Sequence, residues 1–149
     1  MALVEDTPAA RTDLALDLAL WWLHKDQNKS TGQWTSMYTD WRGVETVGAC
    51  INAFQKNGHR LDGNAADNPY VETVRLGYDW LFAKLATVAV SGPADSNNNG
   101  IGLKTPDGEY PDVTVSRIID TLSRAQRHFA MAGTGVPGVK HRHFADLAA

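Results

Sequence analysis

The spacing of apolar side chains predicts helices along most of the chain and no β-strand of useful length. Apolar residues recur every three or four positions in the ranges 44–57, 70–86 and 112–132, which is the period of a helix with one buried face. Gly58 follows the first range, where glycine commonly ends a helix in a left-handed conformation. Pro69 precedes the second, where the start of a helix tolerates proline. The fold class expected is therefore all-α.

The range 12–27 predicts a helix of a different kind. Leucine and tryptophan side chains surround almost its whole circumference, so we expect an inner helix that is buried on most sides. Thr12 or Asp13 is expected to cap its N-terminus, because a side-chain oxygen there can accept hydrogen bonds from the unpaired amides of the first turn.

Polar and glycine-rich stretches separate these helices and indicate the domain organisation. A chain of 149 residues is the size of one domain and can bury a core of its own. We expect residues 1–133 to form that domain and residues 134–149 to be a glycine-rich, weakly structured tail.

Two helical stretches resemble one another within the chain. The sequence Val-Glu-Thr-Val occurs in both "GVETVGACINAF" and "YVETVRLGYDWLF". A repeated helical hairpin explains this match, since one such unit cannot cover its own apolar face and must stack on a neighbour. The alternative is that two amphipathic helices simply share composition.

Composition and charge exclude several classes of function. Apolar residues make up 43% of the chain and charged residues 21%, as in ordinary globular proteins. The net charge of -3 and the lack of a Lys/Arg run argue against nucleic acid or an anionic membrane as a partner. Cys50 is the single cysteine, so no intrachain disulfide forms. The chain shows no signal peptide or membrane span, and its cellular compartment stays open.

One spacing of aromatic and polar residues is more specific than the composition. Trp22 and Leu23 are followed after three residues by Gln27, after four more by Gly32, and after one more by Trp34. This order resembles the QW motif of the terpenoid-cyclase and protein prenyltransferase repeats, known as the prenyltransferase/squalene-oxidase repeat. The resemblance covers Leu14 to about Leu85 well and the remainder loosely.

The resemblance implies an α/α-toroid built from antiparallel helical hairpins, of which this chain would be a part. In such repeats the glutamine and tryptophan stabilise the junction between helices and take no part in catalysis. The physical expectation is that Gln27 reaches the unpaired amides that open the next helix and that Trp34 covers this contact with its indole.

The chain departs from the enzymes of this family. It contains no Asp-x-Asp-Asp acid, and no Asp/His pair is evident that would join Cys50 in a zinc site. The leading hypothesis is therefore a non-catalytic scaffold or interaction segment of a larger bacterial protein. A partial toroid leaves an apolar edge, so the expected partner is the remainder of the same polypeptide or a second copy of the chain.

Two alternatives from other classes remain. The first is a fragment of a terpenoid-cyclase-like or prenyltransferase-like enzyme whose catalytic motif lies outside this chain. The second is a carbohydrate-binding module that uses the aromatic side chains of Tyr38, Trp41 and Trp80 on the concave face. Fold resemblance alone does not choose among these functions.

A polar loop offers a candidate calcium site. Asp95, Asn97 and Asn99 stand at the first, third and fifth positions of an EF-type loop, and the backbone carbonyl of Ile101 at the seventh. The twelfth position, which should carry a bidentate acid, is a proline. Two acids just beyond it could supply the missing carboxylate, Asp107 and Glu109. The alternative is a solvated turn without calcium.

A pair of acids on one predicted helix is a further candidate site. Glu72 and Asp79 lie two turns apart, so both could face a cavity. They could equally belong to the solvated face of the helix.

Overall fold

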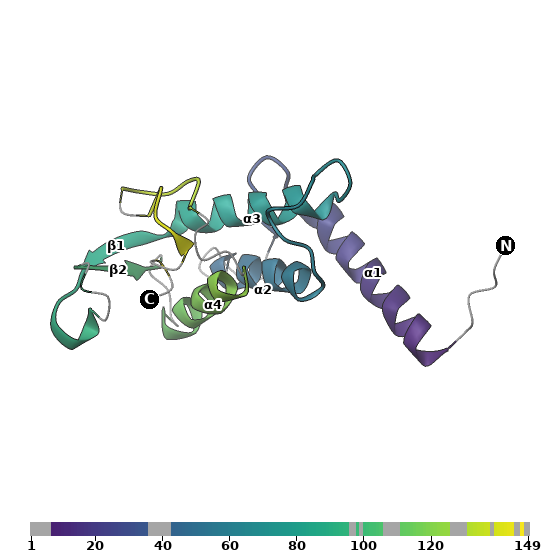
Figure 1. Ribbon diagram of the computed structural model, residues 1–149, viewed down its shortest axis with the longest axis horizontal. Helices are drawn as coiled ribbons and strands as arrows, with labels where there is room; N and C mark the ends of the chain where they lie inside the picture. Colours follow the sequence, from purple (N-terminus) through teal and green to yellow (C-terminus); the bar gives the residue numbers. More distant parts are fainter. Residues whose placement is uncertain are drawn as a thin grey trace.

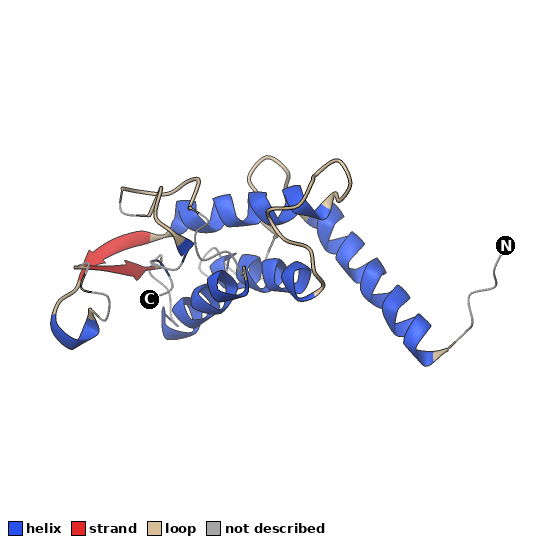
Figure 2. Cartoon of the chain, in the orientation of Figure 1, coloured by secondary structure: helices blue, strands red, loops and turns tan. Residues whose placement is uncertain are grey.

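The computed structural model of the chain describes residues 7–35, 43–95, 98, 100–105, 111–125, 131–137, 139–144 and 147, with the backbone alone at residues 94 and 111–115. These residues form a mostly helical protein with one small two-stranded sheet (Figures 1 and 2). In chain order the elements are α1 (Pro8–Asp26), α2 (Gly43–Lys56), α3 (Tyr70–Lys84), β1 (Ala86–Ala89), the short 3-10 helix η2 (Gly92–Ala94), β2 (Ile101–Lys104) and α4 (Pro111–Arg124).

Helix α2 occupies the centre of the core. It contacts α3 on one side and α4 on the other (Figure 1). Its side chains Val47, Ile51 and Phe54, spaced by four and three residues, are completely buried. The apolar period of the sequence therefore predicted both the extent of α2, to within one residue, and its buried face. Gly58 ends the helix with a φ of 82°, in the left-handed conformation expected there.

A chain of polar side chains crosses the core and joins three helices. Gln55 of α2 donates from its Nε2 to the hydroxyl of Tyr78 in α3, and this hydroxyl donates to the backbone carbonyl of Thr121 in α4 at 2.8 Å. Burial raises the pKa of Tyr78, so its hydroxyl keeps its proton. The network helps fix how the three helices sit against one another, because the Gln55 amide donor and the Tyr78 hydroxyl find these buried partners only in this arrangement.

A β-hairpin follows α3, and the sequence analysis missed it. Strand β1 pairs antiparallel with β2, with Ala86 opposite Lys104 and Ala89 opposite Ile101. The expected helix over 70–86 ends at Lys84 instead, because the chain turns to an extended conformation at Leu85. Strands of four residues are too short to show a clear alternation of apolar and polar positions, which explains the error.

The C-terminal segment contributes to the core. Val139, Phe144 and Leu147 are buried, and the ring of Phe144 lies 5.1 Å from the rings of both Tyr78 and Phe82. This part of the chain, expected to be a weakly structured tail, packs on α3.

The fourth helix was predicted over 112–132, but α4 ends at Arg124, and residues 126–130 lie outside the described part.

Helix α1 extends away from the other helices (Figure 1), and the expectation of an inner helix is wrong. Leu20 is its one buried residue. The helix begins at Pro8 and is capped by Thr7, whose hydroxyl accepts a hydrogen bond from the amide of Ala10 at 3.2 Å. Thr12, an expected cap, instead donates its hydroxyl to the carbonyl of Pro8. Apolar residues surround α1, yet few elements of the described chain lie beside it to cover them.

Among the helices that the structure describes, none combines the length and the apolarity needed to cross a membrane.

Candidate functional site

Gln27 lies at the junction between α1 and α3. Its side chain is buried, and its Nε2 donates to the carbonyl of Gly32 at 3.0 Å and to the carbonyl of Thr73 at 2.9 Å. The sequence analysis expected Gln27 to reach the amides that open the next helix. It binds carbonyls instead, one in its own loop and one in the first turns of α3. The side chain thus connects the end of α1 to α3 through two buried hydrogen bonds.

Trp34 holds the same junction from the other side. Its indole Nε1 donates to the carbonyl of Leu23 in the last turn of α1 at 2.7 Å, and this carbonyl also accepts from the amide of Gln27 at 3.2 Å. The side chain is only 1% exposed, and its ring centre lies 6.2 Å from that of Phe54 in α2. Trp34 therefore caps α1 and packs against α2. We name Gln27, Gly32 and Trp34 together the clamp.

Gly32 brings the loop of the clamp into contact with α3. Its φ is 82°, which side chains rarely adopt, and a Cβ atom built on it would lie 2.0 Å from the carbonyl oxygen of Leu76. Gly77 makes similar room within α3, because a Cβ there would lie 3.0 Å from both Trp34 and Ile51. The glycine of the motif is thus required both for backbone conformation and for close approach.

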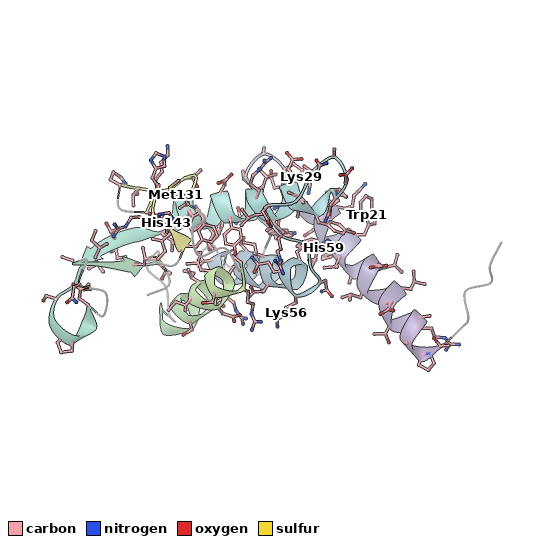
Figure 3. The ribbon with its side chains drawn as sticks, viewed as in Figure 1. Trp21, Lys29, Lys56, His59, Met131 and His143 are labelled. Atoms are coloured by element: carbon pink, nitrogen blue, oxygen red, sulfur yellow. The ribbon has the colours of Figure 1, made fainter. Side chains whose placement is uncertain are left out.

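Polar side chains surround the outer edge of the clamp. Lys29, labelled in Figure 3, donates from its Nζ to Gln27 Oε1 at 3.1 Å and to the hydroxyl of Thr73 at 3.3 Å. A hydrogen bond of 2.6 Å joins Thr73 Oγ1 and His24 Nδ1. Burial, with the charge of Lys29 adding to it, lowers the pKa of His24, which favours the neutral imidazole. Thr73 lies 49 residues from His24 in the sequence, so the local spacing of residues could not indicate this contact.

The exposed face of α1 carries several large apolar side chains. Leu14, Leu18, Trp21 and Trp22 are 60%, 58%, 46% and 62% exposed, and their spacing of three or four residues places them along one side of the helix. We name these four side chains the α1 stripe. Trp22 belongs to the predicted motif, but its exposure shows that it does not pack in the clamp. Apolar side chains gathered in this way mark interaction sites more often than single exposed ones.

The structure describes only part of the predicted calcium site. The carboxylate of Asp95 accepts a hydrogen bond from the amide of Gly100 at 2.9 Å, and Ile101 begins β2. Within the described part of the chain, no three His, Cys, Asp or Glu side chains come close enough together to hold a metal ion. The other predicted ligands lie outside that part: Asn97, Asn99, Asp107 and Glu109.

The aromatic residues predicted for carbohydrate binding are likewise only partly described. Trp80 is 8% exposed, and the ammonium group of Lys84 lies 5.3 Å from its ring centre. Little of this indole is open to a sugar ring. Tyr38 and Trp41 lie outside the described residues.

The two acids of α3 have different surroundings. Glu72 is exposed and lies 3.7 Å from the guanidinium group of Arg75. Asp79 is half-buried and lines a cavity of about 320 Å³ between α3 and the C-terminal segment. The sequence suggested that both acids could face a cavity. Asp79 lines this cavity, and Glu72 does not.

Cys50 is buried in α2, as the sequence indicated. Burial, with the charge of Asp26 adding to it, raises the pKa of its thiol to about 12. A thiol is nucleophilic as the thiolate, so Cys50 is unreactive at neutral pH.

Comparison with known proteins adds no relative to this description. No family model matches the chain, and neither a curated protein nor a solved structure matches it. The described fold defines a mostly helical module in which a clamp holds one projecting helix. The likeness to the terpenoid-cyclase and prenyltransferase repeats stays a prediction that rests on the motif residues.

Proposed function

We propose that the chain is a non-catalytic interaction segment, built like part of an α/α-toroid, that binds a second copy of itself through the α1 stripe. The observation that carries this proposal is the contrast between the two ends of α1. Its C-terminal end is held by the buried side chains of Gln27 and Trp34, whereas its apolar side further along is exposed. A helix whose direction is fixed and whose apolar side chains are exposed on one side is suited to pack against another helix.

The clamp supports the toroid part of the proposal. Gln27 and Trp34 join one helix to its successors, which is the role that the motif has in the repeats it resembles. A single segment of such a ring cannot cover its own apolar face and must meet a neighbour. The exposed α1 stripe is the edge at which this neighbour would pack.

The energetics favour a partner on the α1 stripe. Fully burying a leucine-sized side chain stabilises by about 1.5–3 kcal/mol, and tryptophan offers still more apolar surface. The stripe contains Leu14, Leu18 and two half-exposed tryptophans. Covering these side chains in both copies gives a favourable term large enough to offset part of the entropy lost on association.

The pattern along α1 fits a second copy that runs antiparallel. The helix has 19 residues and is therefore about 28 Å long. A register that places Leu14 of one copy opposite Leu18 of the other overlaps the two helices over almost their whole length. In this register Arg11 lies opposite Trp21 of the second copy, where its alkyl stem can cover the part of the indole that His24 and Lys25 leave open. Apolar surface thus meets apolar surface in one arrangement with twofold symmetry.

Sedimentation velocity tests the proposal. The unmodified chain is expected to dimerise with a Kd on the order of 10 µM or below, because the stripe becomes buried. The double substitution Leu14→Glu and Leu18→Glu places charges in the interface and should leave a folded monomer. The matched control, Thr12→Glu with Ala19→Glu, puts the same two charges at exposed positions of α1 outside the stripe and should still dimerise. A monomeric unmodified chain at about 100 µM would overturn the proposal.

A further inference from the structure

The cavity beside Asp79 lies between α3 and residues 131–144. It measures about 320 Å³, close to the lower end of the range of small-molecule sites. The helix supplies one wall through Arg75, Tyr78, Asp79 and Phe82, and the C-terminal segment supplies the opposite wall through Met131 and Phe144 among others. Figure 3 labels Met131 above the end of α3 where this segment crosses. Residues more than fifty positions apart thus enclose one opening.

The walls of the cavity are mainly aromatic. The rings of Tyr78 and Phe82 are 5.7 Å apart, and Phe144 lies 5.1 Å from each of them. Met131 is exposed at the opening and adds a flexible thioether side chain. Aromatic faces carry a partial negative charge, so they attract a cation as well as an apolar group.

The carboxylate of Asp79 is the charged group that such a cation would meet. Burial raises the pKa of Asp79, and Arg75 lowers it only in part. In the described part of the chain, no side-chain hydrogen bond contributes to this pKa. Arg75 has its own partner in Glu72, at 3.7 Å. Among the described residues, Arg75 offsets the loss of hydration of this carboxylate only in part, so an ammonium group beside it would recover further free energy.

The backbone around Asp79 leaves space in front of the carboxylate. Gly133 lies beside it, and a Cβ atom built there would be 3.2 Å from Asp79 Oδ1. The hydroxyl of Thr134 donates to the backbone carbonyl of Asp79 at 2.7 Å, which fixes the C-terminal segment against α3. The opening is thus fixed in position, and the absent side chain at Gly133 keeps it accessible.

We infer that this cavity binds a small primary amine with an apolar or aromatic body. The ammonium group would lie against the carboxylate of Asp79, and the body would lie among Tyr78, Phe82 and Phe144. Asp79 disfavours an anion, and a neutral alcohol can donate a single hydrogen bond to it but lacks the ion-pair attraction of an ammonium group. The inference does not depend on self-association through α1.

Titration of the full chain with phenethylamine, followed by NMR and calorimetry, tests the inference. We expect saturable binding with a Kd on the order of 1 mM or tighter, as suits a ligand of this size. The neutral analogue 2-phenylethanol should bind at least tenfold more weakly. Asp79→Asn, which keeps the shape of the side chain, should weaken phenethylamine by at least tenfold, whereas Asp17→Asn, at an exposed position of α1, should leave its affinity unchanged.

Two further variants make the test decisive. Gly133→Val keeps Asp79 but fills the space in front of its carboxylate, so it should also weaken phenethylamine by at least tenfold. The stripe variant Leu14→Glu with Leu18→Glu should bind phenethylamine as the unmodified chain does. Equal binding of the amine and the alcohol, unchanged affinity in a folded Asp79→Asn variant, or no saturation by phenethylamine at about tenfold the expected Kd would each overturn the inference.

Discussion

Replacing Gly32 with alanine is expected to lower the free energy of unfolding by about 2–5 kcal/mol, one of the largest effects of any single substitution in this chain. Two costs add. The alanine must adopt a φ of 82°, and its Cβ would lie 2.0 Å from the carbonyl oxygen of Leu76, so the loop must move away from α3. That movement would break the contacts of Gln27 with Gly32 and Thr73. Urea denaturation followed by circular dichroism measures the loss.

Gly58 provides the matched control for this substitution. Its φ is also 82°, but no atom lies within 4 Å of the position of a Cβ. Gly58→Ala therefore carries the conformational cost alone, about 1–2 kcal/mol. Equal losses at the two glycines would contradict the close approach of the loop to α3.

Replacing Trp34 with alanine is expected to cost about 3–5 kcal/mol of stability, the usual range for a buried tryptophan. The substitution removes the ring that packs near Phe54 and the donor that binds the carbonyl of Leu23. Trp34→Phe separates the two effects, because it keeps most of the apolar ring. The carbonyl of Leu23 still accepts from the amide of Gln27 at 3.2 Å, so this variant should lose only about 1–2 kcal/mol.

The same denaturation experiment measures both Trp34 variants. A loss below about 1 kcal/mol in Trp34→Ala would show that the indole does not hold α1 to α2. Exposed Trp22 is the control in the monomeric Leu14→Glu and Leu18→Glu background, where Trp22→Ala should change stability by no more than about 0.5 kcal/mol.

The sequence predicted the core helices well and the surroundings of α1 badly. Val47, Ile51 and Phe54 show the helical period because one face of α2 is buried, so the pattern carried the information. In α1 the apolar residues lie on all sides, which indicates burial only if other elements exist to cover them. A sequence pattern shows which side chains avoid water, but it does not show what covers them. The short strands β1 and β2 carried too few residues for any period to appear.

The same limit separates the two candidate sites. Gln27, Gly32 and Trp34 lie within eight residues of one another, so this local motif indicated a junction there, although the predicted partners of Gln27 were amides and the observed ones are carbonyls. Asp79 was noticed as an acid on a helix, but its cavity depends on Met131 and residues beyond it, brought together only by the fold. Sites assembled from distant segments carry no local signal in a single sequence.

The clamp and the α1 stripe together explain the three tryptophans near the N-terminus. Trp34 is buried and fixes the direction of α1, whereas Trp21 and Trp22 are about half-exposed on the helix that it holds. The first stabilises the module, and the other two would present apolar surface to the second copy that we propose. Aromatic side chains suit both roles, since they offer large contact areas and lose little conformational entropy.

Cross-linking between two variants that each add one cysteine to α1 tests the central claim most directly. In the proposed antiparallel dimer Leu14 of one copy lies opposite Leu18 of the other, so a mixture of the Leu14→Cys and Leu18→Cys chains should cross-link rapidly with a short bismaleimide. Each variant alone should cross-link several times more slowly, and buried Cys50 should not react. Equal rates in the mixture and in the separate variants, or no cross-linked dimer at all, would contradict the account.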